Sequence, residues 1–72
     1  MSEKISAVVI GCGWAGKIHA QAYAQHTAVI LRAVCDPDIE QAARLASRFG
    51  CKAYSTVEEM LTIEKPDIAS IA

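Results

Sequence analysis

The sequence predicts an α/β fold built on a parallel β-sheet, and two features of the chain support this. An unbroken apolar run, Ile5 to Ile10, meets a group of glycines and is followed by an alanine-rich helical stretch. Further strand-like runs then alternate with helical ones, and only a few residues separate them. Parallel strands need helical crossovers, so this alternation predicts the element order β-α-β-α-β-α-β in a parallel sheet.

The first strand is expected over Ile5–Ile10, and its continuous apolarity suits a strand that is buried on both faces. Gly11 ends the strand. The first helix is expected from Ala15 to about Gln25, a stretch without proline whose small residues would let the helix lie close against the sheet.

The second strand, Val29–Cys35, ends at the turn sequence Asp36-Pro37-Asp38. Asp38 is expected to cap a helix that ends before Gly50, a residue type suited to a helix C-terminus. Glu40 and Arg44 are spaced to pair on one face. The apolar stripe of this helix is expected to consist of Ile39, Ala42, Ala46 and Phe49.

The last third of the chain predicts a short third strand over Lys52–Tyr54 and a helix that opens with the capping box Thr56 to Glu59. Val57, Met60 and Leu61 are expected to face inward from that helix. The dipeptide Lys65-Pro66 ends it, and the segment "DIASIA" forms the fourth strand.

The glycines Gly11, Gly13 and Gly16 form the pattern G-x-G-x-x-G between the first strand and the first helix. The first glycine permits a tight turn, the second lets a pyrophosphate approach the backbone, and the third lets the helix pack on the strand. The unpaired N–H groups of a helix N-terminus bind anions. The residues expected to bind a dinucleotide here are Gly11, Cys12, Gly13, Trp14, Ala15 and Gly16, with the amides of Trp14 and Ala15 as the main donors.

Asp36 completes this cofactor site, because it ends the second strand about 20 residues after Gly16, the spacing at which a carboxylate holds the adenosine ribose. The carboxylate opposes a 2′-phosphate, and neither Pro37 nor Asp38 supplies a cation. NAD is therefore favoured over NADP. The predicted fold is of the Rossmann type, for which the first four strands are expected in the order 3-2-1-4.

Composition excludes several partners. The net charge is −1, and no basic cluster points to nucleic acid or an anionic membrane surface. The segment "MSEKIS" lacks the features of a signal peptide, and no apolar run is long enough to span a bilayer. Cys12, Cys35 and Cys51 are widely spaced, without a C-x-x-C pair, so neither disulfides nor a metal site is expected and a cytoplasmic location is favoured.

The segments "AVVIGCGWAGKIHAQAY", "LRAVCDPDIEQAARLASRFG", "YSTVEEML" and "KPDIASIA" resemble the N-terminal domain of the glucose–fructose oxidoreductase and inositol dehydrogenase (Gfo/Idh/MocA) family, from about Ile5 to Ala72. The resemblance implies an NAD(P)-dependent oxidoreductase acting on a sugar, cyclitol or related polyol. It also implies a second domain that binds substrate and often builds a homo-oligomer. Residues 1–72 would then be a partial dinucleotide-binding domain from which the substrate domain is absent.

The family's catalytic lysine lies in an E-K-P motif. Glu64-Lys65-Pro66 spells that motif here, but it precedes the fourth strand, whereas ligands of a parallel sheet bind at the carboxyl ends of its strands. Lys65 is therefore assigned no catalytic role. The catalytic groups are expected beyond residue 72, and this chain alone is expected to be inactive.

Other interpretations of individual residues remain open. Trp14 would either cover the diphosphate or pack against a further domain, and His19 is expected to have a supporting role. The helix N-terminus would lower the pKa of the Cys12 thiol, but no second cysteine lies nearby, so a redox role is not expected. A second class of function is a non-catalytic Rossmann fragment that self-associates through its uncovered fourth strand. A third is a fold that binds S-adenosylmethionine, although the glycine spacing favours a dinucleotide.

Overall fold

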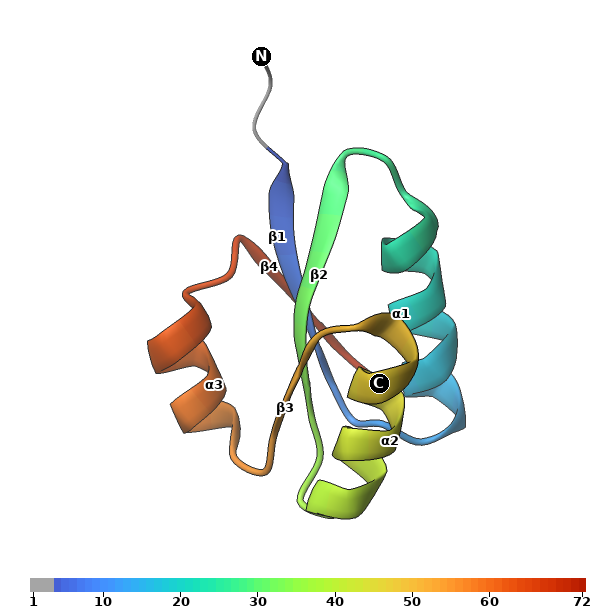
Figure 1. The fold of residues 1–72 in the computed structure, drawn as a ribbon. Helices are drawn as coiled ribbons and strands as arrows, with labels where there is room; N and C mark the ends of the chain where they lie inside the picture. The colour runs from blue at the N-terminus through green and yellow to red at the C-terminus, as the bar shows by residue number, and fades with distance from the viewer. Residues whose placement is uncertain (1–3) are drawn as a thin grey trace.

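The computed structural model describes residues 4–72, so the first three residues of the segment "MSEKIS" lie outside the described residues. Strands and helices alternate along the chain as predicted (Figure 1). The elements are β1 (Ile5–Ile10), α1 (Trp14–Gln25), β2 (Val29–Cys35), α2 (Ile39–Phe49), β3 (Lys52–Tyr54), α3 (Val57–Glu64) and β4 (Ile68–Ile71).

The sheet has four strands in the order β3-β2-β1-β4, and all its neighbours are parallel, which confirms the predicted topology. The central strand β1 pairs with β2 from Ile5 to Ile10 and with β4 from Ala7 to Ile10. All four strands therefore end at the same edge of the sheet, the edge at which a Rossmann fold binds its ligand.

Helices α1 and α2 cover one face of the sheet and α3 lies on the other (Figure 1). Successive side chains of β1 point to opposite faces, so the neighbours Val8 and Val9 belong to separate hydrophobic clusters. Val9 packs in the cluster under α1 and α2, and Val8 packs in the cluster that includes Met60 of α3. Both valines are fully buried, as expected for a central strand covered on both faces.

The side-chain caps predicted at the N-termini of α2 and α3 are confirmed. The Asp38 carboxylate accepts hydrogen bonds from the amides of Glu40 and Gln41 at the start of α2. The Thr56 hydroxyl accepts one from the Glu59 amide at the start of α3. Gly50 ends α2 with φ of 67°, a left-handed conformation that suits glycine.

The inward faces of the helices differ in part from the prediction. Ile39 is 47% exposed, and Leu45, which the predicted stripe omits, is buried in its place. In α3 only Met60 is buried, whereas Val57 and Leu61 are 37% and 40% exposed. The face carrying α3 has no second helix among residues 4–72, so nothing there covers the flanks of α3.

Strand β4 forms one edge of the sheet, because it pairs only with β1. Ile68 is 40% exposed and Ile71 is 79% exposed on this strand. A hydrogen bond between the hydroxyls of Tyr23 and Ser70 links α1 to β4. Among residues 4–72, no helix is long and apolar enough to cross a membrane.

Candidate functional site

The segment of residues 11–13, which joins β1 to α1, is called the glycine turn. It lies between the carboxyl ends of β2 and β4. The Gly11 amide donates to the Cys35 carbonyl at 2.7 Å, and the Ala72 amide donates to the Ile10 carbonyl at 2.9 Å. Gly11 has φ of +96°, and a Cβ built on it would lie 3.0 Å from the Ala72 carbonyl oxygen. Both the conformation and the tight space therefore require glycine at this position.

Gly16 is the residue at which α1 packs against the backbone of Gly11, just after the end of β1. A Cβ at this position would lie 1.8 Å from the Gly11 carbonyl oxygen and 2.8 Å from its carbon. These atoms belong to the backbone and cannot rotate away. The third glycine is thus required by the packing of the helix on its strand, as the sequence predicts.

Gly13 is different, because the fold leaves space around it. A Cβ there would meet only the Gln41 side-chain nitrogen, at 3.7 Å, and the residue has an ordinary φ of −77°. It is exposed at the N-terminus of α1. The packing of residues 4–72 does not explain the missing side chain, whereas the close approach of a diphosphate would.

The N-terminus of α1 offers free donors at the same point. No side chain caps the helix, and its first turn contains no acidic residue. The amides of Trp14, Ala15 and Gly16 therefore have no partner within the helix, and the positive end of the helix dipole faces outward. This donor set has the chemistry that a diphosphate requires, so the residues present fit a dinucleotide cofactor.

The structure brings Asp36 next to the glycine turn. Its Oδ2 accepts a hydrogen bond from the Cys12 amide at 2.9 Å, and its Oδ1 accepts one from the Asp38 amide at 2.9 Å. The Asp36 amide donates to the Tyr54 carbonyl at 3.1 Å. The residue therefore connects the ends of β1, β2 and β3, and its carboxylate is partly buried beside the uncapped helix.

The lowered pKa that a helix N-terminus would give the Cys12 thiol is not what the structure shows. The side chain is fully buried, and its Sγ donates to the Cys35 carbonyl oxygen at 3.4 Å. Burial, with the negative charge of Asp36 as the second cause, raises the pKa of the thiol to about 11 instead of lowering it. Cys12 contributes its backbone to this site, and its thiol is a small core group.

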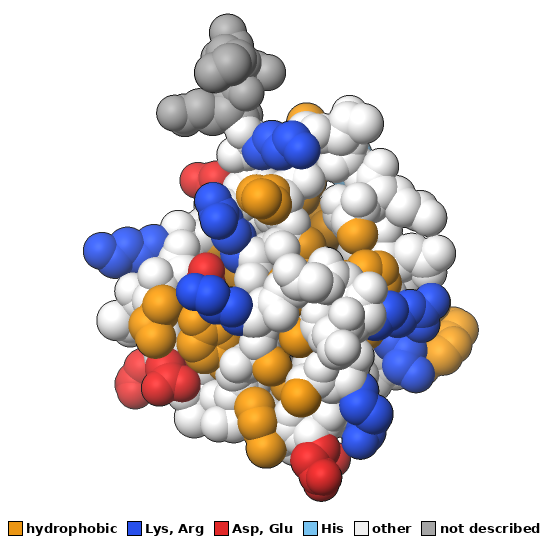
Figure 2. Space-filling model, in the orientation of Figure 1, with side chains coloured by type: hydrophobic (Ala, Val, Ile, Leu, Met, Phe, Trp, Pro, Cys, Tyr) orange, Lys and Arg blue, Asp and Glu red, His pale blue; other side chains and the backbone are white. Residues whose placement is uncertain are grey.

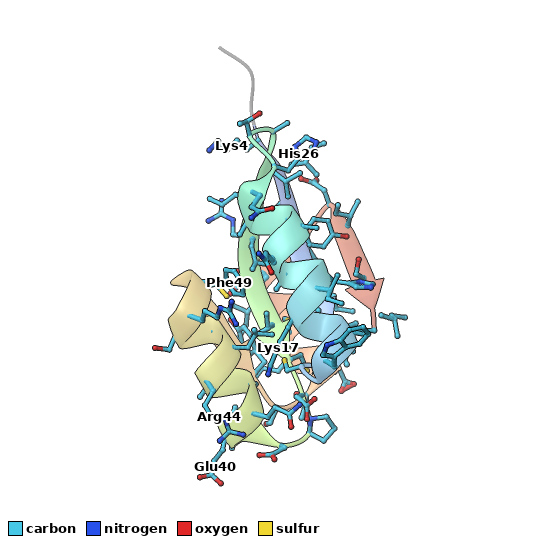
Figure 3. The ribbon with its side chains drawn as sticks, turned by 90° about the vertical axis from the view of Figure 1, so that its right-hand side faces the viewer. Lys4, Lys17, His26, Glu40, Arg44 and Phe49 are labelled. Carbon is cyan, nitrogen blue, oxygen red and sulfur yellow. The ribbon has the colours of Figure 1, made fainter. Side chains whose placement is uncertain are left out.

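A cavity of about 480 Å³ opens beside Gly13, between α1 and α2. The sequence did not predict this cavity. It predicted that Arg44 pairs with Glu40, but the one ion pair among residues 4–72 is Lys52–Glu64. Figure 3 shows Lys17 on α1 and Arg44 on the neighbouring helix α2, and both residues line the cavity. The sequence feature that could have indicated the cavity is the helical spacing of Gln41, Arg44 and Arg48, which puts these polar residues on one face of α2. The lining residues are Cys12, Gly13, Trp14, Lys17, Gln41, Arg44, Leu45 and Arg48.

The remaining sequence candidates lie as follows. Trp14 is 79% exposed at the start of α1, and His19 is half-buried in the middle of that helix. Lys65 ends α3 just before β4, and the following Asp67 amide bonds to the Ser6 carbonyl near the start of β1. The Glu64-Lys65-Pro66 sequence therefore lies at the end of the sheet opposite the glycine turn. No group of three metal-ligating side chains occurs within residues 4–72.

Charge on the surface is mixed. On the face drawn in Figure 2, Lys and Arg side chains are scattered among apolar and acidic ones and do not form one basic surface. The cations beside Gly13 are thus a local feature of the α1–α2 cavity.

The fold and this site match a known family. The model of the GFO_IDH_MocA family, described as an oxidoreductase family with an NAD-binding Rossmann fold, matches residues 5–72. The chain therefore belongs to this oxidoreductase family, as the sequence motifs suggested.

Individual relatives agree with this assignment. D-glucoside 3-dehydrogenase from Escherichia coli (strain K12) is 35% identical over 72 residues, which cover 97% of this chain and 20% of the relative. The solved structure of GenD2 from gentamicin A biosynthesis, in complex with NAD, matches with a TM-score of 0.92 and 32% identity over 100% of this chain and 21% of GenD2. A myo-inositol dehydrogenase from Corynebacterium glutamicum matches with a TM-score of 0.83 and 30% identity over 96% of this chain and 21% of its own. The chain thus spans about one fifth of the length of these relatives.

Proposed function

We propose that this chain is the N-terminal, cofactor-binding part of an NAD-dependent dehydrogenase that acts on a sugar, cyclitol or related polyol. One observation carries the proposal: the uncapped N-terminus of α1 meets a glycine, Gly13, whose missing side chain the fold itself does not require. The names of the similar proteins, a glucoside dehydrogenase and an inositol dehydrogenase, support the substrate class.

In this proposal the chain binds and orients the ADP half of the cofactor. The amides of Trp14 and Ala15 donate to the diphosphate, Gly13 allows it to approach, and Asp36 accepts from the hydroxyls of the adenosine ribose. Gly11, Cys12 and Gly16 shape the turn that holds these groups in place. The nicotinamide ring of the bound cofactor supplies the hydride acceptor.

The proposed cofactor is NAD rather than NADP, because a 2′-phosphate on the ribose would lie close to the Asp36 carboxylate. Lys17 and Arg44, which line the neighbouring cavity, are the cations that could weaken this preference. Comparison of 2′,5′-ADP with 5′-ADP in a binding titration tests it. Tighter binding of 2′,5′-ADP would contradict the preference for NAD.

The catalytic groups and the substrate domain are proposed to belong to sequence beyond residue 72, so residues 1–72 form a partial domain that is inactive alone. The complete enzyme would be a homo-oligomer with a small-molecule substrate. A cytoplasmic location is supported by Cys12, Cys35 and Cys51, which are all free thiols.

Isothermal titration of the 72-residue chain with NAD and with ADP-ribose tests the proposed binding mode. We expect weak binding, with similar affinities for the two ligands, because the residues that form the site contact only the part they share. Much tighter binding of NAD would show that the nicotinamide half is contacted as well. Lack of binding by either ligand would contradict the function.

A second candidate is a non-catalytic module that assembles through β4. It is favoured by the free edge of this strand, on which Ile71 is 79% exposed. Exposed apolar edge strands pair with other chains. Sedimentation at increasing concentration distinguishes the two: a chain that stays monomeric contradicts assembly through β4, and replacing Ile71 with lysine should dissociate any dimer that forms there.

A further inference from the structure

The Asp36 carboxylate has a second contact that the proposed function does not use. Both of its oxygens accept main-chain N–H groups, at 2.9 Å each, and one donor is the Cys12 amide inside the glycine turn. We propose that Asp36 is a positioning residue for the phosphate-binding turn, in addition to any contact with the ribose. This inference rests on the proposed function, since it concerns how the same site is held open.

The contacts around Cys12 explain why a fixed turn depends on this carboxylate. The Gly11 amide bonds to the Cys35 carbonyl at 2.7 Å, but from Cys12 to the start of α1 the chain has no other main-chain bond to β2. The helix start itself has no side-chain cap. The buried Cys12 thiol donates to the Cys35 carbonyl at 3.4 Å, but the bond from the Cys12 amide to Asp36 is the last one made by the main chain before the donors of Trp14 and Ala15.

The carboxylate is suited to this role because it is shared between segments far apart in sequence. One oxygen holds the turn after β1 and the other holds the turn after β2. Hydrogen bonds to a charged acceptor are stronger than neutral ones. A ribose hydroxyl that reaches Asp36 would meet a carboxylate already fixed by both turns, so binding of the sugar and order in the phosphate turn would be coupled through one side chain.

Inorganic pyrophosphate separates the two roles, because it has no ribose. If Asp36 acts only on the sugar, replacing its carboxylate removes a negative charge near the anion and leaves pyrophosphate binding equal or tighter. If Asp36 positions the turn, the same change weakens pyrophosphate binding despite the favourable change in charge. Asp38 provides the matched control, since Asp38→Asn removes the same charge two residues away and keeps an oxygen that can cap α2.

The test compares Asp36→Asn with Asp38→Asn in the 72-residue chain, by amide hydrogen exchange at Cys12 and by titration with sodium pyrophosphate. An asparagine has one acceptor oxygen, so it cannot serve both amides. We expect Cys12 exchange to be about tenfold faster and pyrophosphate binding severalfold weaker in Asp36→Asn, with neither change in Asp38→Asn. Asp36→Ala, which removes both acceptors, should give the larger effect if it folds.

Equal Cys12 exchange in the two asparagine variants would overturn the inference. Pyrophosphate binding that is unchanged or tighter in Asp36→Asn would also overturn it. A wild-type chain that binds no pyrophosphate contradicts the diphosphate site, and with it the proposed function. In that case the exchange comparison still decides separately whether Asp36 holds the turn.

Discussion

Replacing Gly16 and Gly13 with alanine, one at a time, should separate the stability of the fold from the binding of nucleotide. At Gly16 the added Cβ would lie 1.8 Å from the Gly11 carbonyl oxygen, so α1 would have to move by roughly 1.7 Å or more to reach ordinary contact. At Gly13 the nearest atom, the Gln41 side-chain nitrogen, lies at 3.7 Å. The same chemical change therefore clashes with backbone at one site and makes only an ordinary contact with a side chain at the other.

The expected magnitudes follow from these contacts. Gly16→Ala should lower the free energy of unfolding by about 3 kcal/mol or more, since the clash is with backbone and overpacking a close contact costs this much. A chain of 72 residues has only roughly 4–11 kcal/mol of stability in total, so much of it would be lost. Gly13→Ala should cost less than about 1 kcal/mol, the difference between glycine and alanine at a helix N-cap.

Urea denaturation followed by circular dichroism measures the first effect, and calorimetric titration with ADP-ribose measures the second. Gly13→Ala should keep the fold and lose at least about tenfold in affinity, because its methyl group would occupy the space of the diphosphate. If Gly16→Ala does not fold, the Gly13→Ala result still decides the argument about the site. The reasoning is refuted if Gly16→Ala is as stable as Gly13→Ala, or if Gly13→Ala binds as well as the original chain.

Three further measurements test individual residues. Lys65 ends α3 with φ of 45°, so Lys65→Gly should raise the free energy of unfolding by about 0.5–1 kcal/mol in urea denaturation; a loss of stability would contradict the strain. Hydrogen bonds from the Ser6 amide and hydroxyl hold the pKa of Asp67 below its ordinary value. The ionised Asp67 therefore stabilises the fold at any pH above the ordinary aspartate pKa, and this stability is lost as the pH falls through the lowered pKa. Thermal unfolding of Asp67→Asn should show a weaker dependence on acidic pH, and an unchanged profile would contradict the assignment. The hydrogen bond to Glu64 raises the pKa of Tyr54 to about 12, so Glu64→Gln should bring the ultraviolet titration of Tyr54 back toward pH 10; a titration that stays near 12 would assign the shift to burial instead.

The glycine turn shows how far local sequence can predict a candidate site. The three glycines, the strand before them and the helix after them define the turn because each requirement is local: a positive φ at Gly11, an open helix start at Gly13 and a close helix contact at Gly16. The pattern also gave Gly13 and Gly16 different roles, but it could not show which atoms an added side chain would meet at either position. Those atoms belong to other segments of the chain, so only the packing reveals them.

Asp36 shows the limit of the same approach. Its place at the end of β2 was predictable from spacing, since a strand and a crossover helix have regular lengths. Its bond to the Cys12 amide joins residues on different strands and could not be predicted, because it depends on the register between β1 and β2. The pKa of Cys12 was mispredicted for a related reason: burial outweighs the effect of the helix N-terminus.

The sequence by itself determined the order of the elements and the position of the glycine turn, because apolar runs, capping residues and glycines act over a few neighbouring residues. The strand order followed from the Rossmann type that the glycine pattern indicates. Only the tertiary structure decided which helix faces are covered. Val57 and Leu61 of α3 are apolar at helical spacing and still exposed, because α3 has no neighbouring helix on its face of the sheet within residues 4–72. Ile39, the first residue of α2, is exposed as well. The cationic cavity between α1 and α2 likewise exists only because two helices distant in sequence pack side by side on one face.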